Sequence, residues 1–157
     1  MASANGRLTV RGIAMRAEEE IRRLVKEFED CTLPKAEWTH GAHMTVALCY
    51  LLQYGQAKAV ERMRRSIQRF NAANGNSKGY HETITLAWMT VIAGFLATRR
   101  HTHSIAELVC DLLAECGDKN YLLRHYSRDR LLSDAARREW LPPDLEPLGP
   151  HTGTAGQ

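Results

Sequence analysis

The stretch TITLAWMTVIAGFLAT, residues 83–98, decides the fold of this chain. It is an uncharged run that is apolar nearly all round when wound as a helix, and a helix of this kind is buried. The run is shorter than the ~20 apolar residues that a bilayer span needs, and four threonines and a glycine interrupt it. We therefore predict a core helix that begins near His81, forms the most buried element and does not cross a membrane.

The segments around this run carry apolar residues at steps of three and four, which is the pattern of amphipathic helices. Pro34 and Gly55 separate the segments, because proline fits the first turn of a helix and glycine caps its end. Ser104 and Glu107 have the spacing of a capping box and predict a helix start. The predicted helices cover residues 13–31, 35–54, 56–73 and 104–116, with shorter pieces at 119–126 and 128–140.

These segments predict an all-α fold, an up-down bundle of four core helices followed by C-terminal helices and an extended tail. The sequence shows no alternating strand pattern and no internal repeat. A chain of 157 residues has the size of one domain, and 44% hydrophobic with 25% charged residues is ordinary for a globular protein. We expect a single helical domain over residues 1–148 and a flexible tail over 149–157, where the sequence becomes small and polar.

Charge and cysteine usage restrict the classes of partner. The net charge of +3 arises from 21 basic and 18 acidic residues mixed along the chain, which does not favour nucleic acid. The start MASANGRLTVRG has no apolar stretch of signal-peptide length, and the four cysteines stand singly without a CxxC pair. We expect a cytoplasmic protein that acts on a small-molecule substrate, with neither nucleic acid nor membrane as partner. A homodimer is left open.

The stretch EWTHGAH, residues 37–43, places Glu37, His40 and His43 at three-residue intervals. On one helix these side chains would span an arc of roughly 120°, so at least two of them can face one point. Glu-x-x-His is the pair that carboxylate-bridged metal bundles present from a helix, and a carboxylate with a neutral imidazole suits iron, manganese or zinc. We expect Glu37 and His40 to bind such a metal and His43 to be a ligand or a proton carrier.

The stretch GYHETIT, residues 79–85, places Tyr80, His81 and Glu82 where the core helix begins. We expect His81 to be a third metal ligand, Glu82 a general base or the partner that orients an imidazole, and Tyr80 a lid over the cluster. In an up-down bundle the second and fourth helices are parallel, so both clusters should meet at one end. The ends of the first and third helices add further polar groups there: Glu29, Asp30, Cys31, Asn71 and Asn74.

Together the clusters predict a small metal-dependent enzyme, an oxidoreductase among the options, that acts on a small organic molecule. Two alternatives stay open. A metal-free isomerase, cyclase or lyase would use His43, His81 and Glu82, because imidazoles and a carboxylate can transfer protons near neutral pH without a cofactor. In a non-enzymatic interaction module the same groups would only tie helices together. The segment RRHTH, residues 99–103, with His101 and His103, is interpreted as a solvated linker.

The strings LPKAEWTHGAH (33–43), GYHETIT (79–85) and SRDRLLSDAARREWLPPDLEPL (127–148) resemble those of a group of small uncharacterised bacterial helical proteins that share LPxxEWTHxAH. This resemblance covers roughly residues 28–148 and implies no established activity. In architecture the chain also resembles metal-binding four-helix bundles of the DinB kind, although it lacks their later His-x-x-x-His pair. That second resemblance concerns the fold alone.

Overall fold

The computed structural model describes residues 10–99 and 103–149. Within these two ranges the chain forms helices joined by loops and contains no strand, so the predicted all-α helical bundle is confirmed. The long helices are α1 (Val10–Glu29), α2 (His40–Tyr54), α3 (Gln56–Ala73), α4 (Glu82–Ala97) and α5 (Ile105–Cys116). The short helical segments are η1 (Lys35–Glu37), η2 (Tyr121–Arg124), α6 (Arg128–Leu131) and α7 (Asp134–Arg138).

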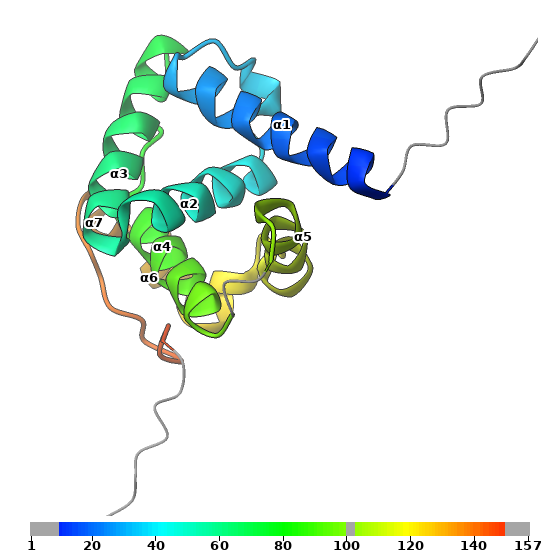
Figure 1. Cartoon of the computed structure of the whole chain (residues 1–157). Coiled ribbons are helices and arrows are strands. Elements are labelled where there is room, and N and C mark those ends of the chain that lie inside the picture. Colours follow the sequence, from blue (N-terminus) through cyan, green and yellow to red (C-terminus); the bar gives the residue numbers. More distant parts are fainter. Residues whose placement is uncertain (1–9, 100–102, 150–157) are drawn as a thin grey trace, which may run out of the picture.

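Helix α2 lies in the middle of the bundle. It contacts α1, α3, α4 and α5, and Figure 1 shows it below α1 and above α4, with α3 rising along one side. Eight of its 15 residues are buried, against six of the 16 in α4. The prediction that residues 83–98 form the most buried element is therefore wrong. The reason is that Ile84, Thr85 and Trp88 of α4 line a cavity, where they remain half-buried.

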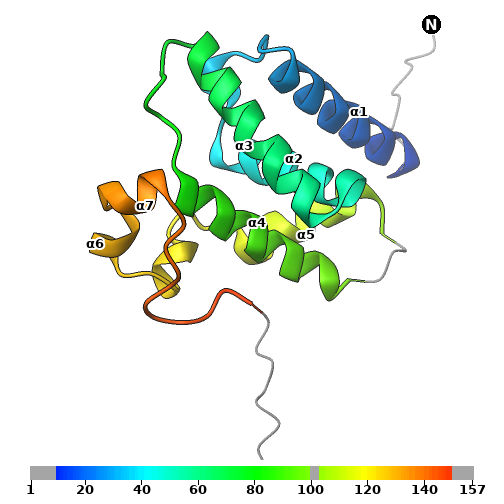
Figure 2. The same cartoon turned by 90° about the vertical axis from the view of Figure 1, so that its left-hand side faces the viewer.

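The other elements lie on two sides of α2. Helices α1 and α3 pack against each other on one side (Figure 2), and the Arg69 guanidinium donates a hydrogen bond to the Glu29 carbonyl over 2.8 Å. The C-terminal ends of α1 and α3 therefore lie together, as expected from the sequence. On the other side, α4 packs against α7 and η2.

Helix α2 begins later than predicted. Residues Lys35–Glu37 form the separate 3-10 helix η1, and Thr39 is the N-cap of α2, with its hydroxyl accepting a hydrogen bond from the Ala42 N–H at 3.2 Å. Threonine is favoured at this position because its hydroxyl satisfies an N–H that the helix leaves unpaired. The prediction of one helix over 35–54 is wrong at its start, and Glu37 is not on the helix that carries His40.

Most other boundaries agree with the prediction. Helix α3 covers the predicted residues, and Gly55 ends α2 with a φ of 74°, which glycine adopts without strain. Ser104 and Glu107 form the predicted reciprocal capping box at the start of α5. The helix predicted over 128–140 is instead divided into α6 and α7, because the Ser133 hydroxyl accepts the Ala136 N–H and starts a new helix.

Residues 139–149 follow α7 without further helix, as predicted for an extended tail, and hydrogen bonds hold them to the body. The Tyr126 hydroxyl donates to the Leu141 carbonyl at 2.8 Å, and the Ser127 hydroxyl donates to the Asp144 carboxylate at 2.6 Å. Most of the tail predicted to be flexible, residues 150–157, lies outside the described residues. None of the described helices combines the length and apolar character needed to span a bilayer, and all four cysteines are free.

Candidate functional site

His40 and His43 occupy the first turn of α2, three residues apart, which places them on one face of that helix. The His43 ring stacks on Trp38 with the ring centroids 3.8 Å apart, and Trp38 stacks in turn on Phe28 at 4.1 Å. The His40 ring instead meets Trp88 of α4 in an edge-on contact at 4.9 Å. Aromatic contacts therefore hold both imidazoles in place.

The Nε2 atom of His40 is buried and has no hydrogen-bond partner within the described part of the chain. The indole Nε1 of Trp38 is likewise buried and has no hydrogen-bond partner among the described residues. Leaving a buried polar atom unpaired costs about 1–3 kcal/mol, so such atoms are uncommon and call for an explanation. Both residues line cavities.

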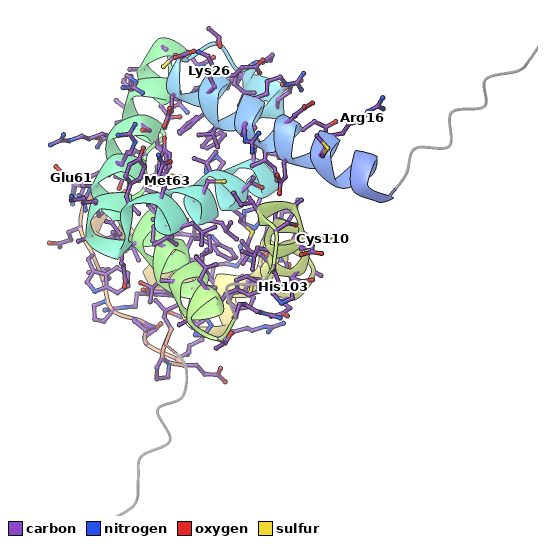
Figure 3. All side chains as sticks on the ribbon, in the orientation of Figure 1. Arg16, Lys26, Glu61, Met63, His103 and Cys110 are labelled. Atoms are coloured by element: carbon purple, nitrogen blue, oxygen red, sulfur yellow. The ribbon has the colours of Figure 1, made fainter. Side chains whose placement is uncertain are left out.

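The first of these, called the apolar cavity below, has a volume of about 330 Å³ and lies among α2, α3 and α4. His40, His43 and Thr85 provide its polar lining, and Met63 of α3, which is labelled in Figure 3, also lines it. The remaining lining is apolar: Met44, Ala47, Ile67, Ile84, Trp88, Met89 and Ile92. A cavity of this size is at the small end of the ~300–1,000 Å³ that small-molecule sites occupy.

Burial favours the neutral form of both imidazoles at this cavity. Burial, with a smaller contribution from neighbouring His40, lowers the pKa of His43 from 6.5 to about 4. Burial also lowers the pKa of His40, although the Asp118 carboxylate opposes this shift. A neutral imidazole has one N–H donor and one lone pair that can accept a proton. The pair can therefore donate a hydrogen bond to a bound molecule and take a proton from it.

A second cavity, called the polar cavity below, has a volume of about 440 Å³ and adjoins the first. The two cavities share His43, Ile67, Ile84 and Thr85 in their walls. The polar cavity also brings together several groups that the sequence places at one end of the bundle: Asn71, Asn74, Tyr80 and His81. Lys35, Trp38, Asn76 and Arg137 complete its polar lining.

His81 lines the polar cavity, but both of its ring nitrogens are already hydrogen-bonded. It is the N-cap of α4, where its Nδ1 accepts the Ile84 N–H at 3.2 Å, and its Nε2 lies 2.9 Å from the Leu131 carbonyl. The acceptor role of Nδ1 fixes the tautomer, because Nε2 must then carry the proton and donate it to the carbonyl. Neither nitrogen is left to bind a metal, so the geometry gives His81 a structural role.

Glu82 is likewise occupied. The Arg64 guanidinium of α3 donates hydrogen bonds to its carboxylate, with Nε lying 3.2 and 3.1 Å from the two oxygens. The Tyr80 hydroxyl donates to the same carboxylate. These hydrogen bonds lower the pKa of Glu82 below its usual 4.5 and keep it ionised. Tyr80 is thus tied to Glu82 rather than free to move as a lid, and Glu82 is poorly placed to act as a base.

The residues predicted to bind a metal are not assembled into one site. Glu37 is exposed on η1, and His81 has no free nitrogen. In the part of the chain that the structure describes, no three His, Cys, Asp or Glu side chains lie together so that they could hold a metal ion. Glu37, His40 and His81 therefore do not fit a shared three-ligand site, and metal binding stays a prediction.

The other polar groups expected at this end have local partners or positions. The Glu29 carboxylate accepts from the Tyr50 hydroxyl at 2.8 Å, and Asp30, directly after α1, pairs with Lys26 of that helix. Cys31 is half-buried in the turn after α1 with a φ of 58°, a conformation uncommon outside glycine. His103 lies beside α5, well away from Met63 (Figure 3), and His101 lies outside the described residues.

Sequence reasoning missed Thr83, which is fully buried at the start of α4. Its hydroxyl donates to the Glu139 carbonyl at 2.6 Å and accepts the Leu141 N–H at 3.0 Å, so it joins α4 to the C-terminal segment. It also missed Lys35 and Arg137 as residues of one cavity. Their positions far apart in the chain give no local signal, because only the packing of α7 beside α4 brings them together.

Comparison of the chain with protein-family models, with curated proteins and with solved structures gave no match. The geometry of the two cavities is therefore the basis on which a function can be inferred.

Proposed function

We propose that the protein is a metal-free acid–base enzyme that shifts a proton within a small organic molecule held in the apolar cavity. The observation that carries this proposal is the unpartnered, buried Nε2 of His40 beside a cavity that His43 also lines. The four free cysteines are compatible with the cytoplasmic location expected from the sequence.

The two histidines have different parts in this proposal. His40 takes the proton, because it lines the cavity and its Nε2 has no hydrogen-bond partner among the described groups. His43 keeps a neutral ring, since burial lowers its pKa to about 4, and its N–H donates a hydrogen bond to the substrate carbonyl. When His40 removes a proton from the carbon beside that carbonyl, the electron pair of the C–H bond forms an enolate. The His40 imidazolium then returns the proton to the same or a neighbouring carbon.

Exchange of carbon-bound protons with solvent deuterium tests this proposal without knowledge of the natural substrate. Cyclohexanone and acetophenone are small, mostly apolar ketones, and NMR in D₂O follows the loss of protons beside their carbonyl groups. We expect the protein to accelerate exchange on at least one of them. His40→Asn should lower the protein-dependent rate by about 10²-fold or more, and His43→Asn by about tenfold or more.

His103→Asn is the matched control, because it removes an exposed histidine outside both cavities. It should leave the exchange rate unchanged. Exchange no faster than in buffer for both ketones, or equal losses in all three variants, would contradict the assigned roles.

A metal-dependent enzyme is the second candidate. The feature that favours it is the pair of imidazoles on one helix face, since neutral imidazole nitrogens are good ligands for iron, manganese and zinc. EDTA separates the two candidates: metal-free chemistry survives it, whereas dependence on a metal predicts loss of exchange and recovery on adding Zn²⁺, Mn²⁺ or Fe²⁺. Metal analysis of protein purified without a polyhistidine tag gives an independent readout.

A further inference from the structure

The charged side chains that line the polar cavity are all positive. Lys35 from η1 and Arg137 from α7 both line it, and the described lining contains neither aspartate nor glutamate. Three asparagines, Asn71, Asn74 and Asn76, add amide groups to the same wall. A concave surface with cations and amides but no carboxylate attracts an anion.

The two cations of this cavity have no anionic partner in the described part of the chain, although the Asn74 amide already donates to the Phe70 carbonyl at 2.9 Å. Neither Lys35 nor Arg137 forms an ion pair with another described residue, and Arg137 makes only long contacts, 3.3 and 3.5 Å, to the carbonyls of Lys78 and Tyr80. The buried Nε1–H of Trp38 in the same wall has no acceptor there. The cavity thus presents two cations that lack an anionic partner among the described residues, and these cations favour the binding of an anionic group.

One nearby carboxylate requires separate consideration. Glu82 is bonded to Tyr80, which lines the polar cavity, and its negative charge would oppose an incoming anion. The Arg64 guanidinium holds this carboxylate through both of its oxygens, so the charge of Glu82 is already balanced. Lys35 and Arg137 therefore remain available for a ligand.

The two cavities join along the wall that contains His43, so an occupant can extend from one into the other. We infer that the substrate is a small organic acid whose apolar body fills the apolar cavity and whose carboxylate is bound in the polar cavity by Lys35 and Arg137. This inference rests on the proposed function: it places the middle of the molecule beside His43, which lines both cavities, and the proton shift in the apolar cavity that His40 lines.

A pair of compounds that differ only in charge tests the inference directly. 4-Phenylbutyrate and 4-phenylbutan-1-ol share an apolar body, and only the first carries a carboxylate. Trp38 and Trp88 line the two cavities, so tryptophan fluorescence and calorimetry both report occupancy. We expect 4-phenylbutyrate to bind about tenfold or more tightly than the alcohol, and Lys35→Gln with Arg137→Gln to remove this preference without weakening binding of the alcohol.

Arg138→Gln is the matched control, because Arg138 is the exposed neighbour of Arg137 on α7 and lines neither cavity. It should bind both compounds as the original protein does. Equal affinity for acid and alcohol, or an equal loss in Arg138→Gln, would overturn the inference while leaving proton exchange, and hence the proposed function, intact. Ala47→Leu narrows the apolar cavity and should weaken the binding of both compounds. If a folded Ala47→Leu variant binds them as well as the original protein does, the ligand lies elsewhere and the inference is overturned. Tight binding of the acid without exchange on any ketone would instead contradict the proposed function alone.

Discussion

At the scale of single residues, His40 and His81 each line a cavity but differ in their hydrogen bonding. His81 has a partner at each ring nitrogen, whereas the buried Nε2 of His40 has none among the described groups. A fully bonded side chain contributes to the stability of the fold, and an unpaired one at a cavity lowers stability in exchange for a binding group. The two residues therefore belong to separate tasks, although the sequence suggests a common site.

This assignment predicts the effect of His81→Ala. The substitution removes the N-cap acceptor of α4 and leaves the buried Leu131 carbonyl unpaired, so the free energy of unfolding should fall by ~1–3 kcal/mol. The melting temperature, followed by circular dichroism, should drop by about 5 °C or more. His81→Asn keeps a capping group and should recover part of the loss. A melting temperature equal to that of the original protein would show that His81 does not hold these two segments together.

At the scale of secondary structure, local patterns account for most of the fold. The three- and four-residue periodicity and the glycine at Gly55 predict α3 at its observed bounds, because helix burial and capping depend on neighbouring residues. The start of α2 was harder to predict, since two local signals compete: Pro34 favours an early start, and Thr39 offers a better cap. The proline signal gave the wrong boundary and placed Glu37 on the wrong element.

The site could be predicted only in part for a related reason. The convergence of His43 with His81 follows from helix order and was expected from the sequence. The hydrogen-bond partners of Glu82 and Thr83 come from elsewhere in the chain: Arg64 lies 18 residues from Glu82, and Glu139 lies 56 residues from Thr83. Such pairings depend on tertiary packing, which a single sequence pattern does not encode.

Thr83 provides a test of how α4 and the C-terminal segment are joined. Thr83→Val keeps the shape of the side chain but removes its hydrogen bonds to Glu139 and Leu141. The free energy of unfolding should therefore fall by ~1–3 kcal/mol. Amide hydrogen exchange over residues 139–149 should accelerate. Thr90→Val on the same helix is the control, because the Thr90 hydroxyl only donates to the Leu86 carbonyl of its own helix. Similar small effects of both substitutions would mean that the Thr83 hydroxyl does not anchor the segment.

At the scale of the whole molecule, the start of α4 joins the helical body to the C-terminal part. Glu82 links it to Arg64 of α3, His81 links it to Leu131 of α6, and Thr83 links it to the segment after α7. The polar cavity includes His81 of this junction in its wall, and the next residues of α4, Ile84 and Thr85, line both cavities. Substitutions at the junction should therefore change the stability of the whole molecule, whereas substitutions of cavity residues that lack partners should change binding.

The buried titratable groups should determine how the stability of the whole molecule depends on pH. Burial lowers the pKa values of His40, His43 and His81 from 6.5, so below pH 6.5 the unfolded chain takes up protons that the folded protein resists. The free energy of unfolding should fall as the pH drops, and the His43 contribution should be lost as the pH falls through about 4. On the alkaline side, burial raises the pKa of Cys49 from 9.0 to about 11 and that of Tyr50 from 10.0 to about 12, so stability should fall again as the pH rises above 9.0.

Urea unfolding at a series of fixed pH values measures this profile and identifies the acidic limb. His43→Gln cannot take up a proton in the unfolded state, so its free energy of unfolding should decline less steeply than that of the original protein as the pH falls from 6.5 to about 4. The alkaline limb should be the same in both proteins, because Cys49 and Tyr50 are unchanged. Parallel acidic limbs would show that His43 titrates alike in the folded and unfolded states. A neutral, buried imidazole could then no longer be assumed at the junction of the two cavities, and the hydrogen bond that His43 is proposed to donate to the substrate would lose its basis.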